Sequence, residues 1–565
     1  MRRLLVFAVA LVAVLGMLAP PAMAQAPAPK VTITGFIDEV GTFGKNLSDY
    51  DNNYSRQKDT QATGRTRGRF DIIGEVGKAK AVLGIELDAF YGQTGNNDTF
   101  LDTRSNLTGG ITQGGRQGAG ANAGFDLNTD TIGMVEIKWL YTEFPLPIPI
   151  PNTVRLGAQP FGTLATDKLA LYANGDFPGV AFSVDFTPAA RLNLTYVQVE
   201  EQLTGFKDGW IRGEDWATIV SFGFTPFKGL TVKPMYSFFQ AQGPTAGSAR
   251  QGRGGVDVAA AFNGGTNPAS GLNGAAGRGV IENRHTVGVD ATFTAGPFSL
   301  QPSVMYQFGN RHQLINASPV GGSPYGTVGS LTKTDISAWL VDVRGAFNVG
   351  PLTLAAMGFF TSGQKANSNP FTGTTRYYQP LDTDTSYLAD WGTQIFSLGI
   401  DYFHILYNNA TGLNPGVAIG YDKYGRMGVG AKASYAITPA FTVGAGVMSN
   451  WTQYKVDTDS VLSAASGLTP LFQTGRPEGD SRYLGTEINA SMTYRFAPGI
   501  AWDVAAGYLF AGDALGHALT IGCCGSTSGS GAVGGAVTNN GINGLGSKNG
   551  VNDVYTATSR VRFSF

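Results

Sequence analysis

The last eleven residues of the sequence alternate between two kinds of side chain, and this alternation limits the possible folds more than any other feature. Apolar or small residues occupy every second position, namely Tyr555, Ala557, Ser559, Val561, Phe563 and Phe565. Polar or charged residues lie between them, namely Thr556, Thr558, Arg560, Arg562 and Ser564. Because successive side chains of a strand point to opposite faces, the pattern predicts a strand with lipid on one side and water on the other. A soluble edge strand is the alternative.

The same alternation recurs along nearly the whole chain, in pairs of stretches with a short join inside each pair and a long segment after it. Residues 66–76 and 81–91 form one such pair around Gly77-Lys78, and a polar segment over 92–130 follows. Further short joins stand at residues 225–229, 295–297, 348–351, 438–440 and 497–499. Strands of about 10 residues can cross a bilayer in a closed sheet. The sequence therefore predicts an all-β transmembrane antiparallel barrel with short turns at one end and long external loops at the other.

The number of strands depends on how residues 363–420 are interpreted. The apolar side chains of this stretch include Trp391, Ile395, Phe396, Ile400 and Phe403. A loop that packs on itself gives 18 strands and an additional strand pair gives 20, while 16 is the smaller alternative, the number being even in each case. The barrel is expected over residues 31–565. Its first strand, at 31–43, should pair with the last so that no edge stays open in lipid.

The N-terminal residues have the organisation of a secretory signal peptide. Arg2 and Arg3 precede an apolar run over 4–18, and Ala22-Met23-Ala24 stands before Gln25. A positive start, a short apolar run and a small-x-small site predict a signal peptide over residues 1–24, followed by a short segment at 25–30. The apolar run is too short for a comfortable membrane span, although an uncleaved anchor is the alternative.

Composition and cysteine usage agree with an exported protein. Only 14% of the 565 residues are charged, and without Arg2 and Arg3 the chain has 38 basic and 41 acidic residues, so no nucleic-acid partner is expected. The two cysteines, Cys523 and Cys524, are adjacent, and neighbouring cysteines cannot form an unstrained disulfide. We expect a loop-tip pair without a catalytic role, with a vicinal disulfide or a metal contact as the alternatives.

Two segments resemble the early strand pairs of Gram-negative general porins. They are residues 67–91, RGRFDIIGEVGKAKAVLGIELDAFY, and residues 137–162, IKWLYTEFPLPIPIPNTVRLGAQPFG. The final strand, which ends on Phe565, is similar to the terminal strand of bacterial outer-membrane barrels, where that aromatic residue is read by the barrel-assembly machinery. The resemblance implies a place in the outer membrane among its lipid and lipopolysaccharide, and a homotrimer. The proline-rich turn at 145–151 and the length of the chain depart from the family.

The resemblance also implies a loop that folds into the pore, here at about residues 163–178. We expect arginines of the lumen-facing parity to oppose acidic residues of this loop across a constriction. The alternative is that Arg67 and Arg69 pair with acidic residues of the next strand along the wall, a contact of at most about 1 kcal/mol. The pore-lining candidates are Arg65, Arg67, Arg69, Glu86, Asp88, Arg155, Asp167, Lys168 and Asp176.

The expected function is a porin, that is, a water-filled channel for passive diffusion of ions and small hydrophilic solutes, without a cofactor or catalytic group. The histidines, His285, His312, His404 and His517, show neither metal-ligand spacing nor a serine and acid nearby in sequence. A barrel hydrolase is one alternative, because a triad is assembled in space. The others are a substrate-specific channel for sugars or organic acids, and a structural barrel such as an adhesin, a surface-layer component or a sleeve around a redox partner.

Overall fold

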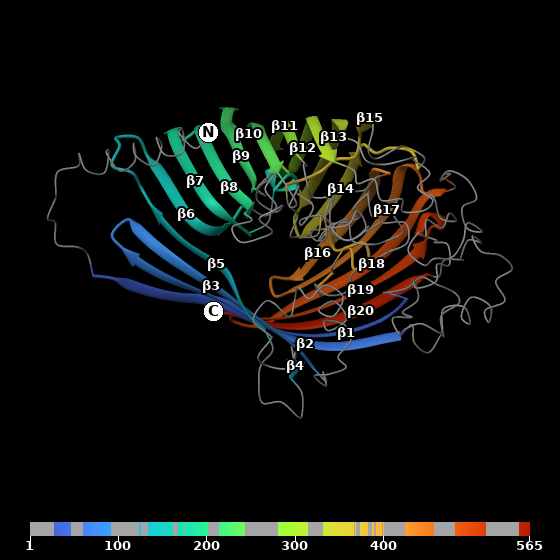
Figure 1. Ribbon diagram of the computed structural model, residues 1–565. Coiled ribbons are helices and arrows are strands. Elements are labelled where there is room, and N and C mark those ends of the chain that lie inside the picture. The colour runs from blue at the N-terminus through green and yellow to red at the C-terminus, as the bar shows by residue number, and fades with distance from the viewer. Residues whose placement is uncertain are drawn as a thin grey trace, which may run out of the picture.

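The protein forms a closed antiparallel β-barrel (Figure 1). The computed structural model describes residues 28–46, 60–91, 124–125, 134–161, 168–173, 176–201, 214–242, 281–314, 331–366, 368, 373–381, 387–388, 391–397, 399–400, 424–456, 479, 481–515 and 553–565. Its wall strands are β1 (Lys30–Lys45), β2 (Thr60–Val76), β3 (Ala79–Tyr91), β5 (Met134–Phe144), β6 (Asn152–Pro160), β7 (Asp176–Thr187), β8 (Ala190–Glu201), β9 (Glu214–Phe227), β10 (Leu230–Gln242), β11 (Ile281–Ala295), β12 (Phe298–Leu314), β13 (Leu331–Val349), β14 (Leu352–Thr361), β16 (Arg426–Thr438), β17 (Phe441–Val456), β18 (Ser481–Ala497), β19 (Ile500–Ala511) and β20 (Val554–Ser564).

The prediction of 18 wall strands is confirmed. All 20 strands of the described residues belong to one sheet, and two of them, β4 (Gly124–Phe125) and β15 (Gly373–Thr375), are only 2 and 3 residues long. Each of these short strands pairs parallel to the external end of a wall strand. β14 pairs directly with β16, so the described part of residues 363–420 adds no strand pair to the wall.

The barrel closes between the first and the last strand, as predicted. β1 and β20 pair antiparallel from Phe36 opposite Ser564 to Lys45 opposite Tyr555. Gly35 and Phe565 add two backbone hydrogen bonds, of 2.9 and 3.0 Å. Every wall strand among the described residues therefore has a neighbour on both sides, which a sheet in lipid requires.

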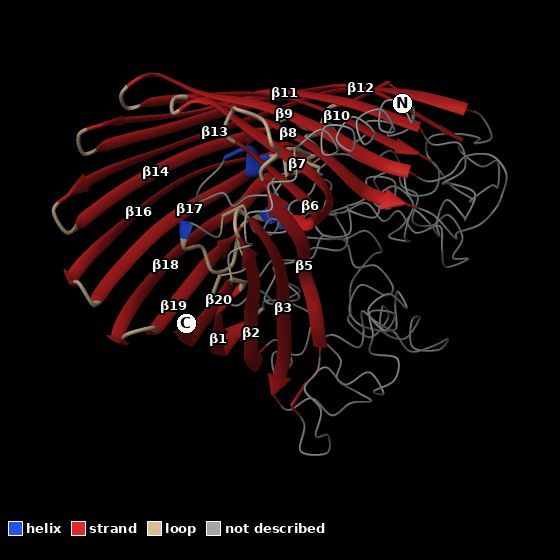
Figure 2. Ribbon diagram, turned by 90° about the vertical axis from the view of Figure 1, so that its left-hand side faces the viewer, coloured by secondary structure: helices blue, strands red, loops and turns tan. Residues whose placement is uncertain are grey.

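Tight turns join the strands at one end of the barrel (Figure 2). The two-residue joins Gly77-Lys78 and Gly350-Pro351 each contain a glycine in the left-handed region, with φ of 62° at Gly77 and 54° at Gly350. Two-residue hairpins need such a conformation, which costs glycine little. The turn residues of the sequence thus fix which strands are antiparallel neighbours.

The outer face of the wall is apolar. Val31, Ile137 and Leu140 expose more than half of their surface, and many valines, leucines and aromatic residues on the other strands are similarly open. Aromatic pairs lie on this face near the turns, such as Phe298 with Phe347, and others lie near the opposite strand ends, such as Tyr508 with Phe510. Exposed apolar side chains between two aromatic rows are typical of a lipid-facing barrel surface. The described residues contain no helix with the length and apolar character that crossing a membrane requires.

Glu39 interrupts this apolar face. It lies on β1 opposite Thr66 and Val561, between Gly35, which bonds to Phe565, and Phe43 nearer the other strand end. Its carboxylate accepts a hydrogen bond of 2.6 Å from Thr66 and a short one from the hydroxyl of Tyr91. A carboxylate on the lipid face is costly, and these two hydroxyls offset part of that cost.

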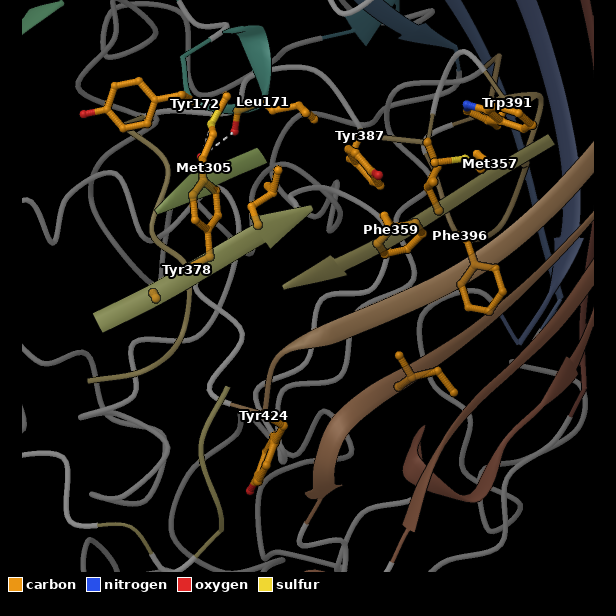
Figure 3. Close-up of a cluster of buried hydrophobic side chains, with 14 of the residues drawn as sticks. Leu171, Tyr172, Met305, Met357, Phe359, Tyr378, Tyr387, Trp391, Phe396 and Tyr424 are labelled. Carbon is orange, nitrogen blue, oxygen red and sulfur yellow. Dashed lines mark hydrogen bonds between the residues drawn. The ribbon is translucent and has the colours of Figure 1, made fainter. Parts of the chain in front are cut away.

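An apolar core lies inside the barrel, separate from the apolar outer face (Figure 3). It contains wall residues such as Met305, Met357 and Phe359 together with side chains from two segments between strands. One segment holds the short helix η1 (Lys168–Leu171) and ends at Ala173, and the other comprises the described parts of residues 377–397. We call the buried side chains of these segments, with the wall residues they contact, the inner cluster. The segments contribute Leu171, Tyr172, Tyr378, Leu381, Tyr387, Leu388, Trp391, Ile395 and Phe396 to it.

Candidate pore lining and constriction

A strip of charged side chains covers the lumen-facing positions of β19, β20, β1, β2 and β3. Because these positions are two residues apart on each strand, their side chains share the face opposite the lipid. Register then places unlike charges side by side, with Arg67 opposite Asp88 and Asp38 opposite Arg562. The charged strip consists of Asp38, Arg65, Arg67, Arg69, Glu86, Asp88, Asp503, Arg560 and Arg562.

The charges of the strip form ion pairs along the wall. Arg67 donates two hydrogen bonds to Asp88, of 2.7 and 2.8 Å, and also lies 3.2 Å from Glu86. Arg65 donates to the same Asp88 at 3.3 Å, and Arg69 lies 3.9 Å from Glu86. The wall pairing considered as the alternative for Arg67 and Arg69 is therefore present. A field between these arginines and the loop at 163–178 stays a prediction.

The same pairing continues across the closure of the barrel. Arg562 donates two hydrogen bonds of 2.5 Å to Asp38, and Arg560 donates two of 2.7 and 3.1 Å to Asp503. Fork-shaped contacts between arginine and carboxylate fix both groups in orientation. The contact between Arg562 and Asp38 also holds the first and last strands together on the water side.

The two most exposed charged groups of the strip are guanidinium groups, and the carboxylates that pair with them are covered. The side chains of Arg562 and Arg69 are 28% and 26% exposed, whereas that of Asp38 is 0% exposed. Glu86 and Asp88 are also nearly covered. Each of the two exposed arginines lies over an aromatic ring at 4.1 Å, Arg69 over Trp139 and Arg562 over Phe36. Stacking holds the guanidinium plane, so water in the lumen meets positive charge.

The remaining candidates lie on neighbouring parts of the wall. Arg155 donates two hydrogen bonds to Glu143, of 2.8 and 3.0 Å, and Lys80 lies 2.8 Å from the same carboxylate. Asp176, at the start of β7, forms an ion pair of 3.1 Å with Lys138. Lys168 begins the helix η1. The predictions for Asp167, Cys523, Cys524, His404, His517 and the signal peptide fall outside the described residues.

A cavity of about 370 Å³ lies between η1 and the lumen face of β5 to β10. Its polar lining includes Glu143, Arg155, Arg191 and Asn193, and its apolar lining includes Phe161 and Tyr172. The hydroxyl of Tyr172 is 2.9 Å from that of Ser237, and burial raises the pKa of this phenol. Such a cavity can hold a small solute that has both a polar and an apolar part.

The two inward segments are bonded to each other inside the barrel. The backbone N–H of Leu381 donates to the carbonyl of Tyr172 at 2.7 Å. The hydroxyl of Tyr378 donates to the carbonyl of Leu171 at 3.2 Å, and Figure 3 shows these residues beside Met305 of the wall. The segments come from widely separated parts of the sequence, so neither would be placed in the lumen by its own residues alone.

One side-chain amide and an arginine of the wall hold the second segment at Gln379. Gln307 on β12 accepts from the backbone N–H of Gln379 at 2.8 Å and donates to its carbonyl at 2.7 Å. Arg284 on β11 donates to the side-chain oxygen of Gln379 at 2.7 Å. One wall amide thus satisfies both backbone groups of a residue that lies away from any strand ladder.

Two wall carboxylates hold the same segment further along. The hydroxyl of Tyr387 donates a short hydrogen bond to Asp342 on β13, and Arg344 donates to that carboxylate at 3.2 Å. Burial, and then the charge of Asp342, raise the pKa of Tyr387 well above its ordinary value, so the phenol remains a donor. Glu487 on β18 accepts from the backbone N–H groups of Gln394, Ile395 and Phe396 at 2.5, 3.1 and 2.8 Å.

Sequence reasoning did not find Asp342 and Glu487 as functional residues. Both occupy lumen-facing strand positions and are fully buried, and the segment between β14 and β16 is unusually aromatic for an external loop. The available signal was an acidic residue at a lumen-facing strand position, together with an aromatic segment between two strands of the same chain. Among the described residues, no three His, Cys, Asp or Glu side chains gather into a metal site.

Comparison with known proteins gives matches to solved structures alone. No family model matches the chain, and no curated relative does. The solved structures include Pseudomonas aeruginosa OccK11 (OpdR), with 7% identity, 95% of this chain and 96% of that chain covered, and a TM-score of 0.41. They also include Acinetobacter baumannii OccAB4, with 10% identity, 94% and 98% covered, and a TM-score of 0.44. At these values the likeness carries no weight, and the assignment rests on the chain's own geometry.

Proposed function

We propose that this protein is an outer-membrane channel that lets small hydrophilic solutes diffuse passively, with a preference for anions. The apolar outer face and the closed wall support a place in a lipid bilayer. The observation that carries the anion preference is that the two most exposed charged groups of the charged strip are the guanidinium groups of Arg562 and Arg69, each paired with a carboxylate that is nearly covered. Charged side chains that line a pore set its ion preference.

Ion selectivity in planar bilayers tests this proposal. With unequal chloride concentrations on the two sides, the reversal potential should have the sign of an anion-selective pore. Neutralising Arg67 and Arg69 together to alanine should reduce that selectivity, and unchanged conductance and selectivity would contradict a role for these residues. A protein that forms no open channel would instead support the alternative of a structural barrel such as an adhesin.

The cavity beside η1 favours a second candidate, a substrate-specific channel. Arg155 and Arg191 could bind a carboxylate or a sugar hydroxyl, while Phe161 and Tyr172 cover the apolar part of the solute. Sugars and organic acids are the solute classes that suit this lining. A conductance that solutes of one class block in a saturable way would support a substrate-specific channel. A conductance that none of the solute classes changes would support a general porin.

Export and assembly belong to the same proposal. The signal peptide predicts that the mature chain begins at Gln25, which N-terminal sequencing of the membrane-extracted protein would check. Phe565 is expected to contact the barrel-assembly machinery, and lipid and lipopolysaccharide to surround the wall. The exposed carboxylate of Glu39 favours an oligomer, with a homotrimer as the expected form, because a second copy would remove this charge from lipid. Light scattering in detergent that gives a monomer at every concentration would contradict it.

A further inference from the structure

The turn from Trp391 to Ser397 is a compact unit that rests on the lumen wall. Ser397 donates a short hydrogen bond to the carbonyl of Thr393, and Thr393 donates to that of Leu388 at 3.1 Å. Gly392 has a φ of 75°, which turns the backbone without strain. Ile395 and Phe396 are 1% and 0% exposed. The turn therefore moves as one unit. The contacts between the turn and the wall determine its position.

The carboxyl group of Glu487 is the polar contact between this turn and β18. Its two carboxylate oxygens accept three consecutive backbone N–H groups at 2.5, 3.1 and 2.8 Å, and the residue has no exposed surface. A buried carboxyl group that accepts several hydrogen bonds holds its donors, and donors left without a partner in such a place are costly. Removing the carboxylate would thus weaken the attachment of the whole turn.

Gly507 on β19 provides the space for this contact. A Cβ at Gly507 would lie 3.0 Å from Cβ of Gln394 and 3.1 Å from Oε1 of Glu487. Any larger side chain that is not bonded covalently to the turn would press against the turn and the carboxylate at once. The wall therefore has an acceptor on one strand and a gap on the next, both at the place where the turn rests.

We propose that Glu487 is a positioning residue that holds the turn from Trp391 to Ser397 in the lumen and so sets the open cross-section of the pore. This inference rests on the proposed channel function. The carboxylate fixes the backbone of the turn, and the turn fixes the inner cluster residues Ile395 and Phe396 against the wall. Detaching the turn frees part of the lumen, which increases the conductance and the size of solute that can pass.

The test compares Glu487→Gln with Asp503→Asn. Both changes replace a lumen-facing acid with its amide, on adjacent strands, but Asp503 binds Arg560, not the turn. Glu487→Gln should increase unitary conductance or add larger substates, whereas Asp503→Asn should shift ion selectivity without new substates. Conductance of Glu487→Gln equal to that of the wild type would overturn the proposal.

A disulfide separates detachment of the turn from a simple change of charge. In a background with Cys523→Ser and Cys524→Ser, the pair Gln394→Cys and Gly507→Cys should bridge, because their Cβ atoms need move apart only slightly from 3.0 Å. The bridge should return Glu487→Gln to wild-type conductance, and reduction should reverse this. If the bridged variant keeps the increased conductance, or if the wild-type background does not form the bridge, the proposal is wrong.

Thiol labelling keeps the test independent of conduction. A water-soluble maleimide should label Gln394→Cys roughly tenfold faster in the Glu487→Gln background, since leaving one buried N–H group without its acceptor shifts an equilibrium by about that factor. Equal labelling rates would overturn the positioning role even in a barrel that conducts normally. Faster labelling in a barrel without any conductance would refute the channel function instead and leave the attachment role standing.

Discussion

Neutralising Asp38 should make the channel more anion-selective, whereas neutralising its sequence neighbour Glu39 should not. Asp38 lies behind Arg562 on the lumen side, and Glu39 lies on the outer face with Thr66 and Tyr91. Asp38→Asn and Glu39→Gln remove the same charge from consecutive residues of β1. The difference in ion selectivity between the two variants therefore shows which face of the strand meets the permeating ions.

The size of the effect follows from the geometry of the Asp38–Arg562 pair. The contact of 2.5 Å, the width of the guanidinium and the radius of an ion place a passing ion roughly 7 Å from the lost charge. One unit charge at about 7 Å in water contributes roughly 0.6 kcal/mol, which a Debye length of about 10 Å at 0.1 M salt reduces by about half. Removing the charge favours anions by this free energy and disfavours cations by the same amount. The ratio of anion to cation permeability should therefore rise roughly threefold at 0.1 M salt and about fivefold at 0.01 M.

Reversal potentials in a salt gradient provide the assay, and a gel at low temperature checks that each variant remains a folded barrel. The asparagine retains one acceptor for Arg562, and that arginine has access to water in the lumen, so we expect the wall to form. Equal shifts for Asp38→Asn and Glu39→Gln, or a larger shift for Glu39→Gln, would refute the assignment of faces and the cationic lining together.

Three further changes test the inner cluster and the closure of the barrel. Tyr387→Phe removes a hydrogen bond to the buried carboxylate of Asp342, which should weaken attachment of its segment by about 1.5–3 kcal/mol, measured as faster thiol labelling of Gln394→Cys. Because the pKa of Tyr387 is raised on folding, this contribution is fully present below about pH 10 and is lost only as the pH rises through the raised value; a loss between pH 6 and 9 would contradict it. Phe396→Ala leaves a cavity in the inner cluster and should lower the free energy of unfolding by about 3–5 kcal/mol, measured by thermal unfolding in detergent. Deleting Phe565 removes two backbone hydrogen bonds to Gly35 and should reduce the yield of heat-modifiable barrel, and an unchanged yield would contradict its role in closure.

The wall could be predicted from the sequence because its signal is local. A strand of the barrel shows its two environments in every pair of residues, so Tyr555 to Phe565 already indicates which side chains meet lipid. The glycines of the short joins also indicate which strands are neighbours.

The contacts of the inward segments could not be predicted in the same way, because they join positions without any shared period. Nothing in the sequence around Glu487 specifies that its partners are the backbone groups of Gln394 to Phe396. The same holds for Leu381 and Tyr172, whose bond depends on two segments that enter the lumen from different strands. Apolar residues such as Trp391 and Phe396 indicate that the segment buries itself, but they do not say against which part of the wall.

The pairing of β1 with β20 has a consequence for how the chain reaches its native state. Asp38 and Arg562, which meet across this pairing, are 524 residues apart in the sequence. Contacts of such separation cost much loop entropy before they contribute any energy, so topologies that depend on them form slowly. Until that contact is made, both end strands offer unpaired edges to any other chain. The time before closure is therefore the stage at which this protein depends most on helper proteins and is most exposed to aggregation.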